Sequence, residues 1–162
     1  MSQREDGPGG TAVVRHARPE DLPRVVELIT EHAAYERSVP PKPGLADRLA
    51  DLLFGPGPRR LGCFVAVLPD GTLAGYATCA PTPSTWDGTE YLHMDCLYLA
   101  ERSRGHGIGP LLIAAVRSEA RELGLPELQW QTPEWNERAI AFYDRLGATS
   151  LSKRRYTLPT EG

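Results

Sequence analysis

The sequence predicts an α/β fold whose sheet is built largely from antiparallel strands. Two observations predict it. Runs rich in β-forming residues alternate with stretches whose apolar residues recur at helical spacing, and the turn sequence Pro69-Asp70-Gly71 joins two of the β-rich runs as a hairpin. A chain of 162 residues fits one compact domain. We expect this domain over residues 11–162, after a disordered tail over 1–10 in which Ser2–Gly10 offers no apolar side chain for burial.

The first part of the domain contains one strand and two helices. Thr11–Ala17 is expected to form a short strand, and Pro19-Glu20-Asp21 opens a helix. Three prolines make Val39–Gly44 a loop, after which a second amphipathic helix ends at Gly55. The apolar positions of the two helices are Leu22, Val25, Val26, Ile29 and Ala33, then Leu45, Leu49, Leu52 and Leu53.

The middle of the chain predicts the main sheet. Cys63–Leu68 and Thr72–Cys79 form the hairpin strands, and Glu90–Leu99 forms a third strand. Between them, Ala80–Gly88 carries two prolines and Trp86, so we expect an irregular segment that shapes the rim of a pocket.

The remaining elements alternate between helix and strand. A helix starts at Ile108 and stops at Gly124. Leu128–Thr132 reads as a strand, Asn136–Leu146 as a helix, and Ser150–Leu158 as a final strand or hairpin.

Composition excludes several classes of protein. The formal charge is −3 and no run of lysine or arginine is long enough for a nucleic-acid surface. No apolar stretch is long enough to cross a membrane, and the first ten residues do not resemble a secretion signal, so a cytoplasmic protein is expected. The three cysteines, Cys63, Cys79 and Cys96, have no CxxC spacing, so we expect packed thiols and no metal site.

A glycine-rich loop carries the strongest functional signal. Arg104-Gly105-His106-Gly107-Ile108-Gly109 follows the strand residues Leu97-Tyr98-Leu99 and leads into a helix. Glycines let backbone N–H groups approach an anion, and the first turn of a helix offers unpaired N–H groups and a partial positive charge. Pro110 lacks an N–H but suits the start of a helix. The loop therefore predicts a pyrophosphate site.

Other loops use similar glycines. A P-loop needs a lysine followed by serine or threonine after its glycines, and the dinucleotide fingerprint of an oxidoreductase is GxGxxG after a parallel strand, whereas this loop reads GxGxG. A turn that only caps a helix remains an alternative for the loop taken alone.

Arg104, Gly107 and Gly109 match the signature Gln/Arg-x-x-Gly-x-Gly/Ala, and with it the sequence resembles the GCN5-related N-acetyltransferases (GNAT family) over roughly Val13–Leu158. It looks most like the diamine (spermidine/spermine) acetyltransferases. The resemblance implies a central mixed, mostly antiparallel sheet flanked by helices, acetyl-CoA as cosubstrate, an amine acceptor and a homodimer. The local matches are Tyr35-Glu36, Leu53-Phe54-Gly55, Trp86 with Tyr91-Leu92, Glu134-Trp135-Asn136-Glu137 and Ile140-x-Phe142-Tyr143.

The resemblance also implies site residues. Glu36, Trp86 and Asp95 would bind the amine, and Tyr143 would protonate the leaving thiolate. The residues implied for coenzyme binding lie on the third strand of the sheet, in the glycine loop and at the start of the last helix. They are Leu97, Tyr98, Leu99, Arg104, Gly105, His106, Gly107, Ile108, Gly109, Pro110, Asn136 and Arg138.

The chemistry needs similar groups independently of the family. A protonated alkylamine cannot attack a thioester, so a carboxylate such as Asp95 must help to remove a proton, and an acid such as Tyr143 must protonate the thiolate. Each residue also has a structural interpretation. Tyr143 lies at helical spacing in an apolar face, and Asp95 is in phase with His93, which is itself a second candidate base, unless a bulge changes its face.

The sequence does not identify the amine that accepts the acetyl group. Ser152-Lys153-Arg154-Arg155 replaces the Gly-Trp pair of the diamine enzymes, and Asp95 is one methylene shorter than their glutamate. The candidates are a polyamine, a lysine-like amino acid, an amine-bearing antibiotic and a protein amine. A coenzyme-A-binding sensor without transfer activity is the alternative from another functional class.

Overall fold

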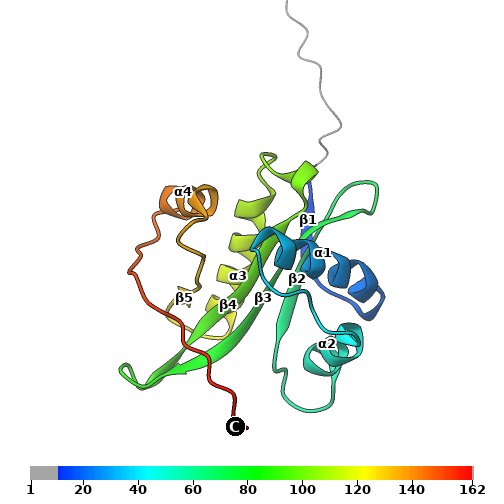
Figure 1. Ribbon diagram of the computed structural model, residues 1–162. Coiled ribbons are helices and arrows are strands. Elements are labelled where there is room, and N and C mark those ends of the chain that lie inside the picture. The colour runs from blue at the N-terminus through cyan, green and yellow to red at the C-terminus, as the bar shows by residue number, and fades with distance from the viewer. Residues whose placement is uncertain (1–10, 162) are drawn as a thin grey trace, which may run out of the picture. The chain divides into compact units, whose positions relative to one another are not determined.

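The computed structural model describes residues 11–161, so the tail predicted over 1–10 lies outside the described residues. The chain falls into two compact units that divide after Gln131. The first holds the sheet and helices α1 to α3, and the second holds helix α4 (Figure 1). The prediction of a single domain over 11–162 stays a prediction.

The sheet of the first unit has five strands in the order β1-β2-β3-β4-β5. The first three pairings are antiparallel and β4 pairs with β5 in parallel, which confirms the mixed, mostly antiparallel sheet. At the predicted β2–β3 turn, the Thr72 backbone N–H donates to the Asp70 carboxylate at 2.9 Å. The strands are β1 (Val13–His16), β2 (Gly62–Val67), β3 (Leu73–Ser84), β4 (Thr89–Leu99) and β5 (Leu128–Gln129).

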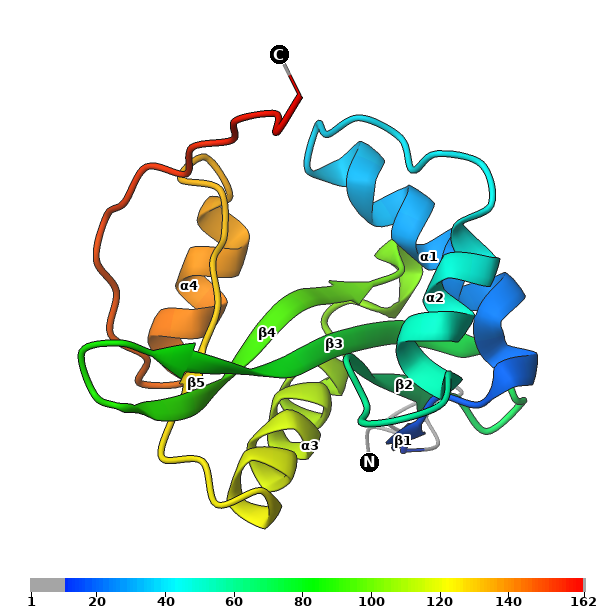
Figure 2. The same cartoon turned by 90° about the horizontal axis from the view of Figure 1, so that it is seen from below.

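Helices cover both faces of this sheet (Figure 2). α1 (Leu22–Tyr35) packs on β3 and β4 and carries α2 (Leu45–Phe54) against it, whereas α3 (Ile108–Glu122) packs on the opposite face. α1 follows a short 3-10 turn (Pro19–Asp21), where the Asp21 carboxylate accepts from the Arg18 N–H at 2.8 Å and pairs with Arg15. The hydrogen bond from Arg15 holds the pKa of Asp21 below its ordinary value.

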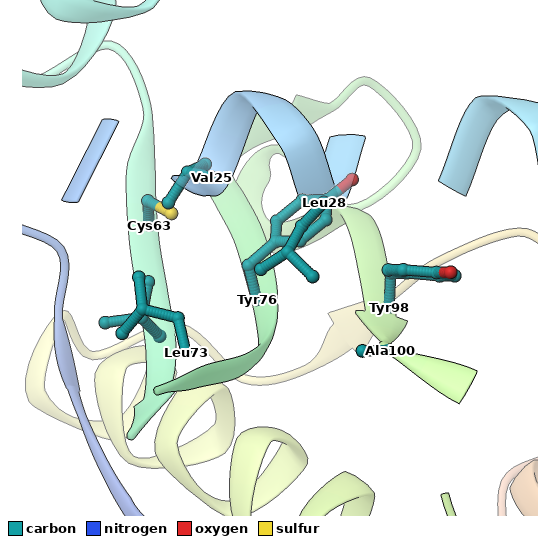
Figure 3. Close-up of a cluster of buried hydrophobic side chains, with 8 residues drawn as sticks. Val25, Leu28, Cys63, Leu73, Tyr76, Tyr98 and Ala100 are labelled. Atoms are coloured by element: carbon teal, nitrogen blue, oxygen red, sulfur yellow. The ribbon is translucent and has the colours of Figure 1, made fainter. Parts of the chain in front are cut away.

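The core on the α1 face joins the helix to three strands (Figure 3). Tyr76 of β3 and Leu28 of α1 are among its most buried side chains. Tyr98, near the end of β4, packs in the same cluster. Because this cluster holds α1 against β3 and β4, it fixes which polar groups of the helix face those strands. Its members are Val25, Leu28, Cys63, Val65, Leu73, Tyr76, Tyr98 and Ala100.

The sequence predicts an irregular segment over Ala80–Gly88. This prediction is wrong for residues 80–84, because β3 continues through both prolines and ends at Ser84. β2 pairs with β3 only as far as Cys79, so the outer part of β3 has a neighbour only on the β4 side. Pro81 lies opposite Leu92, whose N–H points away from β3 and donates to the Glu127 carbonyl. The proline nitrogen therefore faces the open edge, where the missing N–H breaks no hydrogen bond of the sheet.

The predicted final strand or hairpin over Ser150–Leu158 is also wrong, because the structure has no strand there. Leu151 and Tyr156 are exposed. A strand forms its hydrogen bonds with a neighbouring strand, and the described part of the second unit contains no strand with which this segment could pair. Among residues 11–161, no helix has both the length and the apolar character that a membrane crossing requires.

Candidate active site

The glycine loop has the backbone conformation that the sequence predicts. After a short 3-10 turn (Glu101–Ser103), Gly105 and Gly107 adopt φ of +81° and +77°, and Gly107 is the N-cap of α3. A Cβ atom at either glycine would meet nothing within 4 Å. Glycine is therefore needed for the left-handed backbone, and the space beside the loop is open to a ligand.

The side chain of Arg104 connects this loop to β4 and α1. Its Nε donates to the Leu99 carbonyl at 3.1 Å. Its guanidinium lies 4.6 Å from the ring centre of Tyr35 and 5.4 Å from that of Tyr98. Cation–π contacts at these distances hold the loop against the end of the strand.

A β-bulge interrupts β4 at Asp95. Thr78 pairs with Cys96 and the next residue of β3, Cys79, pairs with Met94, so Asp95 is the extra residue of the longer strand. Side chains four residues apart in a regular strand face the same side of the sheet. The bulge breaks this alternation, because Met94 and Tyr98 face opposite sides. The face of Tyr98 is the one covered by α1.

The Asp95 carboxylate is accessible, with 64% of its side chain exposed. One oxygen lies 3.9 Å from His93 Nε2, and the other accepts a weak hydrogen bond from the Cys96 thiol at 3.8 Å. His93 and Asp95 thus lie close to each other, and the choice between them as the base stays a prediction. A solvated carboxylate with a histidine beside it is able to accept a proton.

The structure also places His32 of α1 in this region, which the sequence analysis missed. Its Nδ1 lies 2.8 Å from the Tyr76 hydroxyl and its Nε2 lies 2.8 Å from a Glu36 carboxylate oxygen. Its ring stacks on Tyr98, with 5.0 Å between ring centres and 16° between planes. Burial lowers the pKa of His32, although the carboxylates of Glu36 and Asp95 act in the opposite direction. The i, i+4 spacing of His32 and Glu36 was the one signal in the sequence.

The three cysteines are free thiols, as expected. Burial raises the pKa of Cys96 to about 11 and those of Cys63 and Cys79 to about 12. Near neutral pH these residues are therefore protonated, and Cys96 has no thiolate with which to attack an acetyl group.

Trp86 lies apart from the other residues predicted for the amine. It is 95% exposed in the loop between Ser84 and Thr89, at the far end of the β3–β4 hairpin from the bulge. The first unit therefore brings Glu36 and Asp95 toward the same histidine, and it does not bring Trp86 to them.

The second unit contains the other predicted residues. Asn136 is the N-cap of α4 (Glu137–Arg145), and its side chain accepts from the Ala139 N–H at 3.3 Å. Tyr143 packs beside Phe142, with ring centres 5.3 Å apart. Asn136 and Tyr143 are seven residues apart and so share one face of the helix, whose first turn includes Arg138. The roles predicted for these three residues stay predictions.

Comparison with known proteins identifies the family. Residues 23–148 match the model of the acetyltransferase (GNAT) family, which is most of the chain. The chain belongs to the GNAT family. Enzymes of this family use acetyl-CoA as cosubstrate, and this GNAT protein is an N-acetyltransferase. The family, the fold and the enzyme class that the resemblance implied are thus confirmed.

Several known proteins resemble this GNAT enzyme. The D-amino-acid N-acetyltransferase HPA3 of Saccharomyces cerevisiae is 30% identical over 83% of each chain. A thialysine N-epsilon-acetyltransferase of Bos taurus is 30% identical over 87% of this chain and 86% of that protein. A solved structure of a probable acetyltransferase shares the fold, with a TM-score of 0.77, 19% identity, and coverage of 93% and 99% of the two chains. The relatives do not specifically support the predicted likeness to diamine enzymes.

Gly75 allows β3 to approach β4 closely at the segment predicted for coenzyme binding. A Cβ atom there would lie 2.5 Å from the Tyr98 carbonyl oxygen and 2.5 Å from Leu99 Cδ2. We expect Gly75→Ala to lower the free energy of unfolding by about 1–3 kcal/mol, because the backbone of β4 has to move. The measurement is urea unfolding followed by circular dichroism.

Gly62→Ala is the matched control for Gly75→Ala. Its Cβ atom would make ordinary 3.5 Å contacts with Cys79, so stability should stay within about 1 kcal/mol of wild type. Equal losses in the two variants would contradict the close approach at Gly75.

Proposed function

We propose that this GNAT enzyme transfers the acetyl group of acetyl-CoA to a primary amine of a small, lysine-like amino acid. The observation that carries the proposal is the exposed Asp95 carboxylate at the β4 bulge, next to the strand segment 97–99. The names of the relatives, which refer to thialysine and D-amino acids, favour an amino acid over a polyamine as the acceptor. The cytoplasmic location and the homodimer stay predictions.

Charge on the α1 face supports a cationic acceptor. The carboxylates of Asp95 and Glu36 both act on His32, so they lie within electrostatic reach of the same group. Two carboxylates in a partly buried region favour binding of an alkylammonium ion. An acceptor that arrives as a cation must then lose a proton before it reacts.

The protein groups divide the work of the reaction. Asp95, with His93 beside it, accepts the proton of the ammonium group, and Tyr143 donates a proton to the departing thiolate. Backbone groups of Leu97 and Leu99 bind the pantetheine arm, and the N–H groups from Gly105 to Gly109 bind the pyrophosphate. When acetyl-CoA is bound, it supplies the activated acetyl group as a thioester. These roles follow from the family resemblance and from the open glycine loop.

An amine panel tests the acceptor directly. Purified enzyme with acetyl-CoA is given L-lysine, thialysine, ornithine, spermidine, an aminoglycoside and a lysine-containing peptide, and release of free thiol is measured. We expect the lysine-like amino acids to give the highest kcat/KM, because the relatives named for thialysine and D-amino acids favour this acceptor class. A higher kcat/KM for spermidine or for the peptide would contradict the acceptor class. Binding of acetyl-CoA without thiol release from any amine would support the sensor.

Substitution of Asp95 tests the base. Asp95→Asn should lower kcat by about 10²-fold and move the rate maximum to higher pH, because only the free-base amine then reacts. Glu90→Gln, which removes an exposed carboxylate from the same strand, should leave both unchanged. A pH–rate profile of Asp95→Asn that overlays the wild-type profile would rule out the assignment.

Substitution of Gly107 tests the coenzyme loop. Gly107→Ala and Gly124→Ala both place a side chain on a left-handed backbone, at φ of +77° and +69°, in open space. Both should lower the melting temperature to a similar extent. Only Gly107→Ala should weaken acetyl-CoA binding, by about tenfold or more as measured by calorimetry. Equal affinities in the two variants would place the pyrophosphate elsewhere.

A further inference from the structure

His32 is a buried titratable group that the proposed reaction does not use. Only 12% of its side chain is exposed, and both ring nitrogens have partners at 2.8 Å, Glu36 on its own helix and Tyr76 on β3. Glu36 is more accessible, with 30% of its side chain exposed. The histidine thus lies between the sheet and a carboxylate that solvent reaches.

The partners of His32 determine where its proton lies. An ionised carboxylate only accepts hydrogen bonds, so Nε2 carries the proton and donates it to Glu36. In the neutral ring, Nδ1 then accepts from the Tyr76 hydroxyl. Burial, which lowers the pKa of His32, and burial of Tyr76, which raises the pKa of that phenol, both favour this arrangement at neutral pH. In it, Glu36 keeps its full negative charge and has a fixed position.

Charged and titratable groups face His32 from several elements. Glu36 and Asp95 raise its pKa and Arg104 lowers it, while the rings of Tyr76 and Tyr98 pack against it from β3 and β4. A proton added to His32 would therefore place a positive charge near both carboxylates of the amine site. That charge would oppose the binding of a second cationic group.

We propose that His32 is a positioning residue that sets specificity by controlling the charge at Glu36. In its neutral form it holds the Glu36 carboxylate as a second anionic contact, used by acceptors that carry a further ammonium group besides the one that reacts. Protonation of His32 cancels this contact. The inference rests on the proposed function, since it assumes that the acceptor binds on the α1 face. It extends the proposed function by naming the group that selects acceptors with two cationic nitrogens.

The kinetic test compares L-lysine with Nα-acetyl-L-lysine, which lacks the second ammonium group. Between pH 8 and pH 5, we expect the KM for lysine to rise about fivefold relative to that for the acetylated analogue, with no relative change in kcat. The lower pH is needed because burial lowers the pKa of His32. Glu36→Gln should give a high lysine KM at both pH values.

The key variant is His32→Gln, whose amide N–H still donates to Glu36 but does not titrate. It should keep the low lysine KM at both pH values. His16→Gln removes a histidine that pairs with Glu119 instead, and it should behave as wild type. A pH-dependent lysine KM in His32→Gln equal to that of wild type would overturn the proposal.

A direct measurement keeps the proposal testable if a variant fails to fold or if neither lysine is acetylated. NMR of the ¹⁵N-labelled imidazoles in the wild-type protein should show His32 as the Nε2–H tautomer with a pKa below 6.5, the ordinary value. An imidazolium that persists at pH 8 would overturn the charge control by itself. Failure of all amines in the kinetic assay, with the expected NMR titration, would count against the acceptor class and leave the His32–Glu36 pairing supported.

Discussion

The extra residue at position 95 of β4 determines how the rest of the site is built. Without it, a regular strand would direct Met94 and Tyr98 to the same face of the sheet. With it, Met94 is buried on the α3 face, Tyr98 joins the α1 core, and the Asp95 side chain is left accessible between them. One unpaired residue thus provides two hydrophobic surfaces and a solvated carboxylate within a single strand.

Tyr98 connects the two functions of this strand. His32 stacks on its ring, and the guanidinium of Arg104 lies within cation–π distance of the same ring. Arg104 begins the glycine loop, whereas His32 holds Glu36 on the side proposed for the amine. The proposed coenzyme and acceptor regions therefore share one buried aromatic side chain, and the position of each depends on the packing of α1 against β4.

Local features of the sequence were enough to predict the helices, the glycine loop and most of the sheet. Helical periodicity and positive-φ glycines need no knowledge of distant neighbours. The wrong or missed predictions involve features that depend on neighbours distant in the sequence. Pro81 fits a strand only because β2 ends early, and the described part of the second unit has no strand with which Ser150–Leu158 could pair. His32 was missed because Tyr76 and Tyr98, which bury it, are far away in the sequence.

The prolines in the outer part of β3 also affect how the protein behaves in a crowded solution. Beyond Cys79, this strand is an exposed sheet edge, and such edges are templates on which strands of other molecules add and aggregates grow. Pro81 and Pro83 remove successive donors from that edge, since residues two apart point the same way. The long hairpin therefore extends from the sheet without offering a continuous row of N–H groups to a neighbouring chain.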